Sequence, residues 1–217
     1  MDISLIKELI IILPILFFSV ILHECGHGIV ANKCGDPTAR MLGRITLNPI
    51  PHIDLFGTII LPLILVITRS PIMLGWAKPV PVNPFNLRHP KRDMIWVSIG
   101  GVGVNILLAF LGIIALLILI RLPNPLFQTP AIAVVVQFFE YLIQINVILA
   151  TFNLIPIPPL DGSRIVMGLL PMQYAEKYAK LEPFGIIIVI GLLWLHVFDP
   201  IFWLVSSLIS LIFRVFS

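Results

Sequence analysis

The sequence predicts an all-α polytopic membrane protein with five to six transmembrane helices, and two observations lead to this prediction. Hydrophobic residues make up 59% of the 217 residues and charged residues 12%, against roughly 25% charged residues in an ordinary soluble domain. Apolar runs also approach or exceed the roughly 20 residues of a spanning helix, at about 5–30, 53–70, 94–121, 131–155, 183–198 and 200–213. Only short connections remain, so we expect one membrane-embedded domain over residues 1–217.

The first run predicts a helix from about Ser4 to Cys34, ending at Gly35-Asp36-Pro37. This run has neither the basic start nor the small-residue cleavage site of a signal peptide. We therefore expect it to be a retained anchor.

Two segments that follow this helix predict other structures. In residues 38–48, small and apolar side chains alternate with polar ones, and this period of two predicts a strand or a small β-hairpin at the membrane interface. Residues 75–84 contain three prolines within six positions, which predicts an extended or re-entrant proline-rich segment. The run 53–70, between the two segments, either crosses the membrane fully or is itself re-entrant.

The runs 94–121 and 131–155 predict two helices that pack inside a bundle. The first carries Ser98, Gly101 and Asn105 on one stripe, and small and polar residues let helices approach closely in a membrane. The second carries further polar residues that should face inward: Gln137, Glu140, Gln144, Asn146 and Asn153. A proline-broken stretch at 153–160 and a short polar helix at 172–181 come next, before two final runs divided by Asp199-Pro200.

Lysine and arginine residues cluster in three regions, around 33–44, 88–92 and 164–180. Such residues are retained on the cytoplasmic side of a membrane. We therefore expect an integral protein of a prokaryotic cell membrane, with the end of the first helix and the end of the 131–155 helix on the cytoplasmic side.

The pattern that carries chemistry is His23-Glu24-Cys25-Gly26-His27, inside the first predicted helix. Residues four apart share a helix face, so both imidazoles can reach one metal ion while Glu24 flanks them. An ionisable residue at the centre of a spanning helix costs about 2.5–3.5 kcal/mol on insertion scales, and a divalent cation offsets that cost. The pattern predicts a zinc site; the alternative is a polar pair that joins helices by hydrogen bonds.

Zinc in an enzyme takes a third protein ligand and keeps one open position. The candidates for this ligand are His52, Asp54, His89, Glu140 and Asp161. Asp161 stands out because the prolines before it leave unpaired carbonyls, which require water or a polar cavity. An equally good interpretation of Asp161 alone is an N-cap for a helix that starts near Ser163.

Together these residues resemble the site-2 protease family of intramembrane zinc metalloproteases. His23-Glu24-x-x-His27 matches the first motif of the family, and Asn153-x-x-Pro156-x-x-x-x-Asp161-Gly162 looks like the second, which supplies the third zinc ligand. The two motifs in this order are far more specific than either alone. The resemblance covers about residues 20–165 and is to the short subgroup without PDZ or CBS domains.

The region between the motifs also resembles the family. Gly101 and Asn105 fall where the family has a Gly-x-x-x-Asn stretch, although Val102 departs from the usual Gly-Pro pair. This departure leaves a catalytic role for Asn105 open.

Resemblance and spacing imply that His23, His27 and Asp161 hold one Zn²⁺ per chain and that Glu24 is the general base for a zinc-activated water. The implied reaction is hydrolysis of peptide bonds in transmembrane protein substrates within the lipid bilayer, with no nucleic-acid partner. Asn153 is a candidate for binding substrate or shaping the ligand loop. An unwound substrate could pair with the 38–48 or the 75–84 segment.

His52 and Asp54 have two interpretations: an interfacial polar pair, or a gate or extra ligand near the metal. For the whole chain, the alternative function is a metal-binding transporter without hydrolytic activity. A transporter would not require Glu24 and would carry polar residues across the bilayer on both sides of the metal. The third possibility is a scaffold with vestigial ligands.

Overall fold

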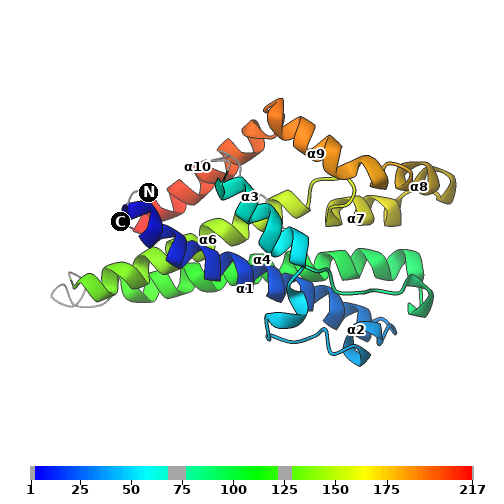
Figure 1. The fold of residues 1–217 in the computed structure, drawn as a ribbon, viewed down its shortest axis with the longest axis horizontal. Coiled ribbons are helices and arrows are strands. Elements are labelled where there is room, and N and C mark those ends of the chain that lie inside the picture. The colour runs from blue at the N-terminus through cyan, green and yellow to red at the C-terminus, as the bar shows by residue number, and fades with distance from the viewer. Residues whose placement is uncertain (1–2, 68–76, 122–128, 217) are drawn as a thin grey trace.

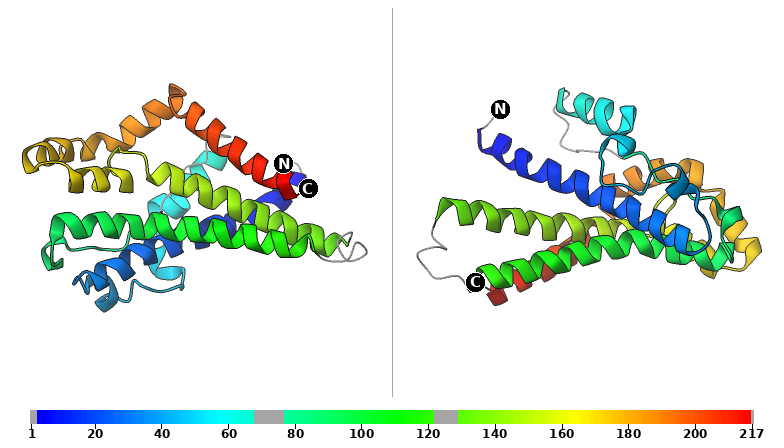
Figure 2. Two further views of the ribbon diagram at one scale, coloured as in Figure 1. Left: turned by 180° about the vertical axis from the view of Figure 1, so that it is seen from behind. Right: turned by 90° about the horizontal axis from the view of Figure 1, so that it is seen from below.

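The computed structural model describes residues 3–67, 77–121 and 129–216, and within these ranges the chain is helical with turns and no strand. Three long helices form its centre: α1 (Ile3–Lys33), α4 (Pro90–Leu119) and α6 (Pro130–Asn153). α1 and α6 run in one direction and α4 runs in the other (Figure 1). α4 packs against both α1 and α6, as the views from behind and below also show (Figure 2).

These three helices are each long and apolar enough to cross a membrane. Even α6, the shortest at 24 residues, is about 36 Å long at 1.5 Å per residue, more than the ~30 Å hydrocarbon core. Each of the three predicted runs at 5–30, 94–121 and 131–155 therefore forms one long helix.

The distribution of side chains is that of a membrane protein. Large apolar side chains cover the outside of the long helices: Phe18 is 48% exposed, Phe110 57% and Ile118 63%. The fully buried positions between the helices include polar side chains instead: Ser19, Ser98, Asn105 and Asn146. Polar groups inside and apolar groups outside suit a helix bundle whose solvent is lipid.

The C-terminal part of the chain consists of shorter helices that lead away from the long bundle and back along it (Figure 1). These are α7 (Asp161–Leu169), α8 (Met172–Ala179), α9 (Gly185–Trp194) and α10 (Asp199–Phe216). The segments 172–194 and 199–211 are together apolar enough for one span but are bent by 71° where they meet. The described residues thus contain three candidate spans, or four with this bent pair, and the predicted five to six are not confirmed.

The predicted strand or β-hairpin at 38–48 is wrong. Residues Thr38–Met41 form a single helical turn, α2, and a turn and bends follow. Gly43 has φ +63°, its N–H donates to the Arg40 carbonyl, and the Arg44 N–H donates to the Ala39 carbonyl. This is a Schellman C-cap. The local bonds use the backbone groups that a strand would offer to a partner, so the alternation of side chains does not decide the conformation.

The described part of the run 53–70 is a short helix whose first half is π-helical. Leu55–Ile60 form a π-helical segment, η2, and Leu61–Ile67 form the short helix α3, so the two together are shorter than a span. Residues 68–70 lie outside the described ranges, as do 75 and 76 of the proline-rich tract. Residues 77–83 are non-helical, as predicted for that tract, and η3 (Pro84–Asn86) leads to α4.

Candidate metal centre

Two histidines on α1 point at one another across a single helical turn. The Nε2 atoms of His23 and His27 are 3.0 Å apart, and His23 is only 7% exposed. The spacing of four residues produces this arrangement because positions i and i+4 stand one above the other on a helix. α1 therefore presents two nitrogen donors at one point inside the bundle.

Asp161 comes from the start of α7 and lies against both histidines. Its Oδ2 atom is 3.2 Å from His23 Nε2 and 3.3 Å from His27 Nε2. Leu160, not Asp161, occupies the N-cap position of α7, and no side-chain hydrogen bond caps that helix. The N-cap interpretation of Asp161 is therefore wrong, and the carboxylate points at the imidazoles.

The turn before α7 brings Asp161 to this position. The chain passes from the end of α6 through a proline-rich turn, and Gly162 lies so close to the Leu154 carbonyl that an added Cβ would be 2.2 Å from its oxygen. Only glycine permits that approach. The proline-broken stretch thus returns the chain from α6 towards α1 within a few residues.

The three donor atoms fit a zinc ion. A tetrahedral site with metal–ligand distances of about 2.0–2.1 Å separates its donors by roughly 3.3 Å, and the observed separations are 3.0, 3.2 and 3.3 Å. Asp161 Oδ2 is buried and has no hydrogen-bond partner. Such a buried oxygen costs free energy unless a positive group, such as a metal ion, lies beside it. His23, His27 and Asp161 are the one group of three or more potential ligands in the described part of the chain.

The far nitrogens of both imidazoles are held by oxygen acceptors. His27 Nδ1 is 2.8 Å from the backbone oxygen of Val97, and His23 Nδ1 is 2.6 Å from Asn105 Oδ1. A carbonyl oxygen can only accept, so in the neutral rings the proton sits on Nδ1 and each Nε2 carries a lone pair. Two lone pairs 3.0 Å apart repel one another, and a cation between them relieves this repulsion.

The Asp161 carboxyl is ionised at neutral pH. Burial raises its pKa, but the two imidazoles beside the carboxyl outweigh burial and lower the pKa to about 2. An ionised carboxylate is the form that binds a divalent cation.

Glu24 flanks the three donors without joining them. It is half-buried, and its Oε2 accepts a hydrogen bond of 2.7 Å from the backbone N–H of Val80. Val80 belongs to the non-helical segment 77–83, so this segment lies directly beside the HExxH turn. No local sequence pattern indicates this contact, since 56 residues separate its partners.

The other candidates lie apart from this group. His52 is fully buried, with Nε2 3.0 Å from the Thr46 carbonyl, and Asp54 accepts the Gly57 N–H at 2.7 Å as the N-cap of η2. Asn153 donates to the Leu149 carbonyl one turn back along α6. His89 precedes α4 as its N-cap residue, and Glu140 lies on α6.

Sequence reasoning missed some of the contacts that hold the histidines. A backbone acceptor such as Val97 leaves no signal in a sequence. Asn105 did have a signal in the sequence, because it is a polar residue on the small-residue stripe of α4. Ser19 had one as well, because it is a polar residue on α1 four positions before His23.

Comparison with known proteins identifies a family and several relatives. The profile of peptidase family M50 matches residues 119–197. The "Putative zinc metalloprotease YwhC" of Bacillus subtilis (strain 168) is 42% identical over 185 residues, which cover 85% of this chain and 79% of that protein. The "Putative zinc metalloprotease Rip2" of Mycolicibacterium smegmatis is 28% identical over 190 residues, covering 88% and 69% of the two chains. No solved structure gives a significant match.

Proposed function

Because the chain belongs to peptidase family M50, the site-2 protease family of zinc metalloproteases, we propose that it hydrolyses peptide bonds of transmembrane proteins within the bilayer. The observation that carries this proposal is the convergence of His23, His27 and Asp161 at 3.0–3.3 Å inside a bundle with an apolar exterior. One membrane-embedded domain holds one zinc ion.

The proposed ligands are the Nε2 atoms of His23 and His27 and the carboxylate of Asp161. A zinc ion there supplies Lewis-acid activation of water and of the scissile carbonyl. Glu24 takes a proton from the attacking water and returns it to the leaving amine nitrogen. The N–H of Val80 fixes one oxygen of this carboxylate and leaves the other, Oε1, for proton transfer.

A substrate helix has to unwind before its backbone can reach these residues, because helical hydrogen bonds shield the peptide bond. Segment 77–83 lies beside Glu24 and is non-helical, so it is the part of the chain that we propose to lie along the unwound stretch. Residues 38–48 lose this role, since they form no strand.

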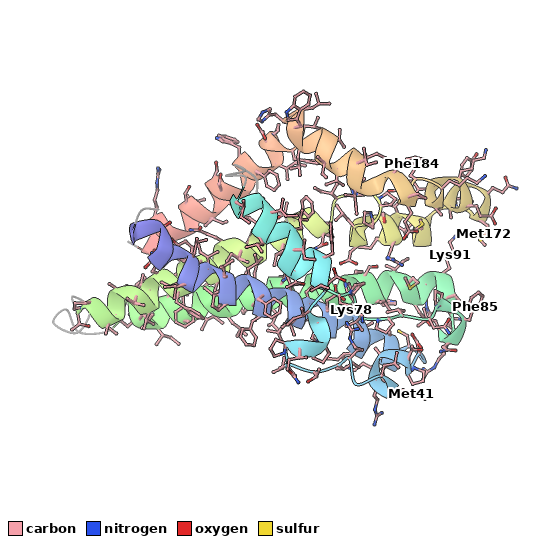
Figure 3. The ribbon with its side chains drawn as sticks, in the orientation of Figure 1. Met41, Lys78, Phe85, Lys91, Met172 and Phe184 are labelled. Carbon is pink, nitrogen blue, oxygen red and sulfur yellow. The ribbon has the colours of Figure 1, made fainter. Side chains whose placement is uncertain are left out.

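The site is proposed to open towards the cytoplasm of a prokaryotic cell. Basic residues lie on or next to the end of α1, α2, the start of α4, α7 and α8. They are Lys33, Arg40, Arg44, Arg88, Lys91, Arg92, Arg164, Lys177 and Lys180. Phe85, Lys91 and Met172 mark this end of the molecule in Figure 3. Positive residues favour the cytoplasmic side.

Zinc content of the purified protein in detergent tests the ligand assignment. We expect about one zinc per chain in the wild type and strongly reduced zinc in His23→Ala and Asp161→Ala. Retention of zinc by Asp161→Ala together with its loss from His23→Ala would move the third ligand elsewhere. A wild type that takes up no zinc on reconstitution would contradict the function itself.

Cleavage of a reconstituted transmembrane reporter tests the role of Glu24. Glu24→Gln should keep zinc and lose turnover by about 10²- to 10⁴-fold, the usual range for a general base. Glu8→Gln is the matched control, because Glu8 is an exposed residue on the same helix. Zinc movement across vesicles with no reporter cleavage, unaffected by Glu24→Gln, would favour the transporter.

A further inference from the structure

A continuous line of buried polar side chains leads from His23 into the centre of the bundle. Asn105 Oδ1 lies 2.6 Å from His23 Nδ1, and Asn105 Nδ2 donates to Asn146 Oδ1 at 2.9 Å. Asn146 Nδ2 in turn donates to Ser19 Oγ at 2.9 Å and to the Leu142 carbonyl at 2.8 Å. The line joins α1, α4 and α6 and returns to α1 one turn before the histidine.

The direction of every hydrogen bond in this line follows from the contact between Asn146 and the Leu142 carbonyl. The Leu142 carbonyl can only accept, so Asn146 must present its amide nitrogen there and its oxygen to Asn105. Asn105 then presents its nitrogen to Asn146 and its oxygen to His23. The His23 proton is thereby placed on Nδ1, and Nε2 is left with the lone pair that a metal ligand requires.

The burial of these groups makes the directions strict. Asn105 and Asn146 are 0% exposed and Ser19 is 1% exposed. A reversed amide would face donor with donor and acceptor with acceptor without water to compensate, and an unsatisfied buried polar group costs about 1–3 kcal/mol.

We propose that Asn146 and Ser19 are positioning residues of the metal centre, which fix the orientation and tautomer of His23 through Asn105. This inference rests on the proposed zinc site and extends it to the face of α6 that packs against α1 and α4. The contacts on which it depends are all between residues of this chain.

Zinc affinity and zinc-free stability, measured in parallel, test the role of Asn146. Asn146→Leu, an apolar near-isostere, should weaken zinc binding about 10- to 100-fold in chelator competition, the range found when partners of ligands are removed. The zinc-free protein should lose some stability as well, because the buried amide nitrogen of Asn105 loses its acceptor, so zinc affinity is the readout that decides. Gln137→Leu is the matched control, because this amide on the same helix donates to the Tyr141 hydroxyl of α6, and its zinc affinity should not change.

The Ser19 side chain offers a test with smaller changes of shape. Ser19→Thr keeps the hydroxyl, and Ser19→Val gives a side chain with nearly the shape of threonine but no hydroxyl. We expect the valine variant to bind zinc at least several-fold more weakly than the threonine variant. The visible absorption of bound Co²⁺ should shift with valine and not with threonine, because the geometry at His23 changes.

A double substitution separates positioning from packing. If Asn146 acts through Asn105, then Asn146→Leu should cause little further loss of zinc affinity in an Asn105→Leu background. Independent losses in the double variant would overturn the inference. So would unchanged zinc affinity in Asn146→Leu, whether or not the zinc-free protein is destabilised. A wild type without zinc would overturn the zinc site and this inference with it, whereas normal zinc with no effect of Asn146→Leu would overturn this inference alone.

Discussion

The side chain of Asp36 joins the end of α1 to the segment before α4. It is fully buried and accepts the Asn83 N–H at 2.7 Å, the Asn86 side-chain amide at 3.0 Å and the Thr38 N–H at 3.1 Å, besides the Thr38 hydroxyl. Burial raises the pKa of Asp36, but these hydrogen bonds outweigh burial and hold the pKa below its ordinary value. The carboxylate thus keeps segment 77–83, and with it the Val80 N–H, close to Glu24.

This lowered pKa predicts an acid-labile contact. A carboxyl whose pKa is lower in the folded state stabilises that state above its unfolded pKa of about 3.9, and the contribution disappears as pH falls through the folded value. Asp36→Asn should therefore be less stable than the wild type at pH 7, and the difference in melting temperature should shrink below about pH 4. A constant difference over this range would contradict the assignment.

Single residues were predictable where a spacing carries the chemistry. His23, Glu24 and His27 follow from one helix period, and Asp161 followed from the break before it together with the family resemblance. The line of Asn105, Asn146 and Ser19 joins three helices. Asn105 and Asn146 were predicted as inward polar residues and Ser19 was not, and the pairing of all three depends on the register of helices α1, α4 and α6, which no local pattern contains.

At the scale of elements, the crossing of α1 and α4 leaves no space under the two imidazoles. A Cβ at Gly101 would lie 2.4 Å from His27 Cε1 and 2.8 Å from His23 Cε1, whereas one at Gly103 would meet nothing within 4 Å. The Gly-x-x-x-Asn stretch of α4 thus has two physical tasks. Glycine makes room for the rings, and the side-chain oxygen of Asn105, one turn later, accepts a hydrogen bond from His23 Nδ1–H.

This pair of glycines gives a matched prediction. Gly101→Ala should displace the imidazoles and weaken zinc binding at least about tenfold, as disturbance of ligand orientation does. Gly103→Ala, on the same helix, should leave zinc binding unchanged and slightly stabilise α4, by up to about 1 kcal/mol of helix propensity. Chelator competition and thermal unfolding measure the two effects. Equal zinc affinities in the two variants would show that the rings can move aside freely.

Element prediction succeeded for the long apolar runs and failed where local hydrogen bonds decide the conformation. The helices α1, α4 and α6 follow from length and hydropathy alone. At 38–48 the period of two was a poor guide, because Asp36 and the Gly43 cap favour one helical turn and leave no free strand edge. The π-helical segment η2 likewise begins at the Asp54 cap, whose role was not apparent from composition.

At the scale of the whole molecule, the proposed zinc ion joins α1 to α7. Ligands from two distant parts of the chain mean that binding free energy adds to folding stability, by about 4 kcal/mol at a free zinc concentration 1,000 times the dissociation constant. We predict that zinc raises the melting temperature of the detergent-solubilised protein and that a chelator reverses the rise.

Two variants make this prediction specific. Asp161→Asn should abolish most of the zinc-dependent rise, since a neutral amide is a poor ligand, while Glu24→Gln should retain it because Glu24 is no ligand. A rise of the same size in Asp161→Asn would mean that zinc stabilises the protein from another place.

The origin of the ligands in α1 and α7 also has a consequence for biosynthesis. α1, with His23, Glu24 and His27, is translated before α4 and α6, and Asp161 is made only after them. A nascent chain that ends before α7 therefore holds the proposed general base and two of the proposed ligands without the third. On the proposed mechanism such a chain is inactive, and hydrolytic competence arises late, when most of the polypeptide is already in place.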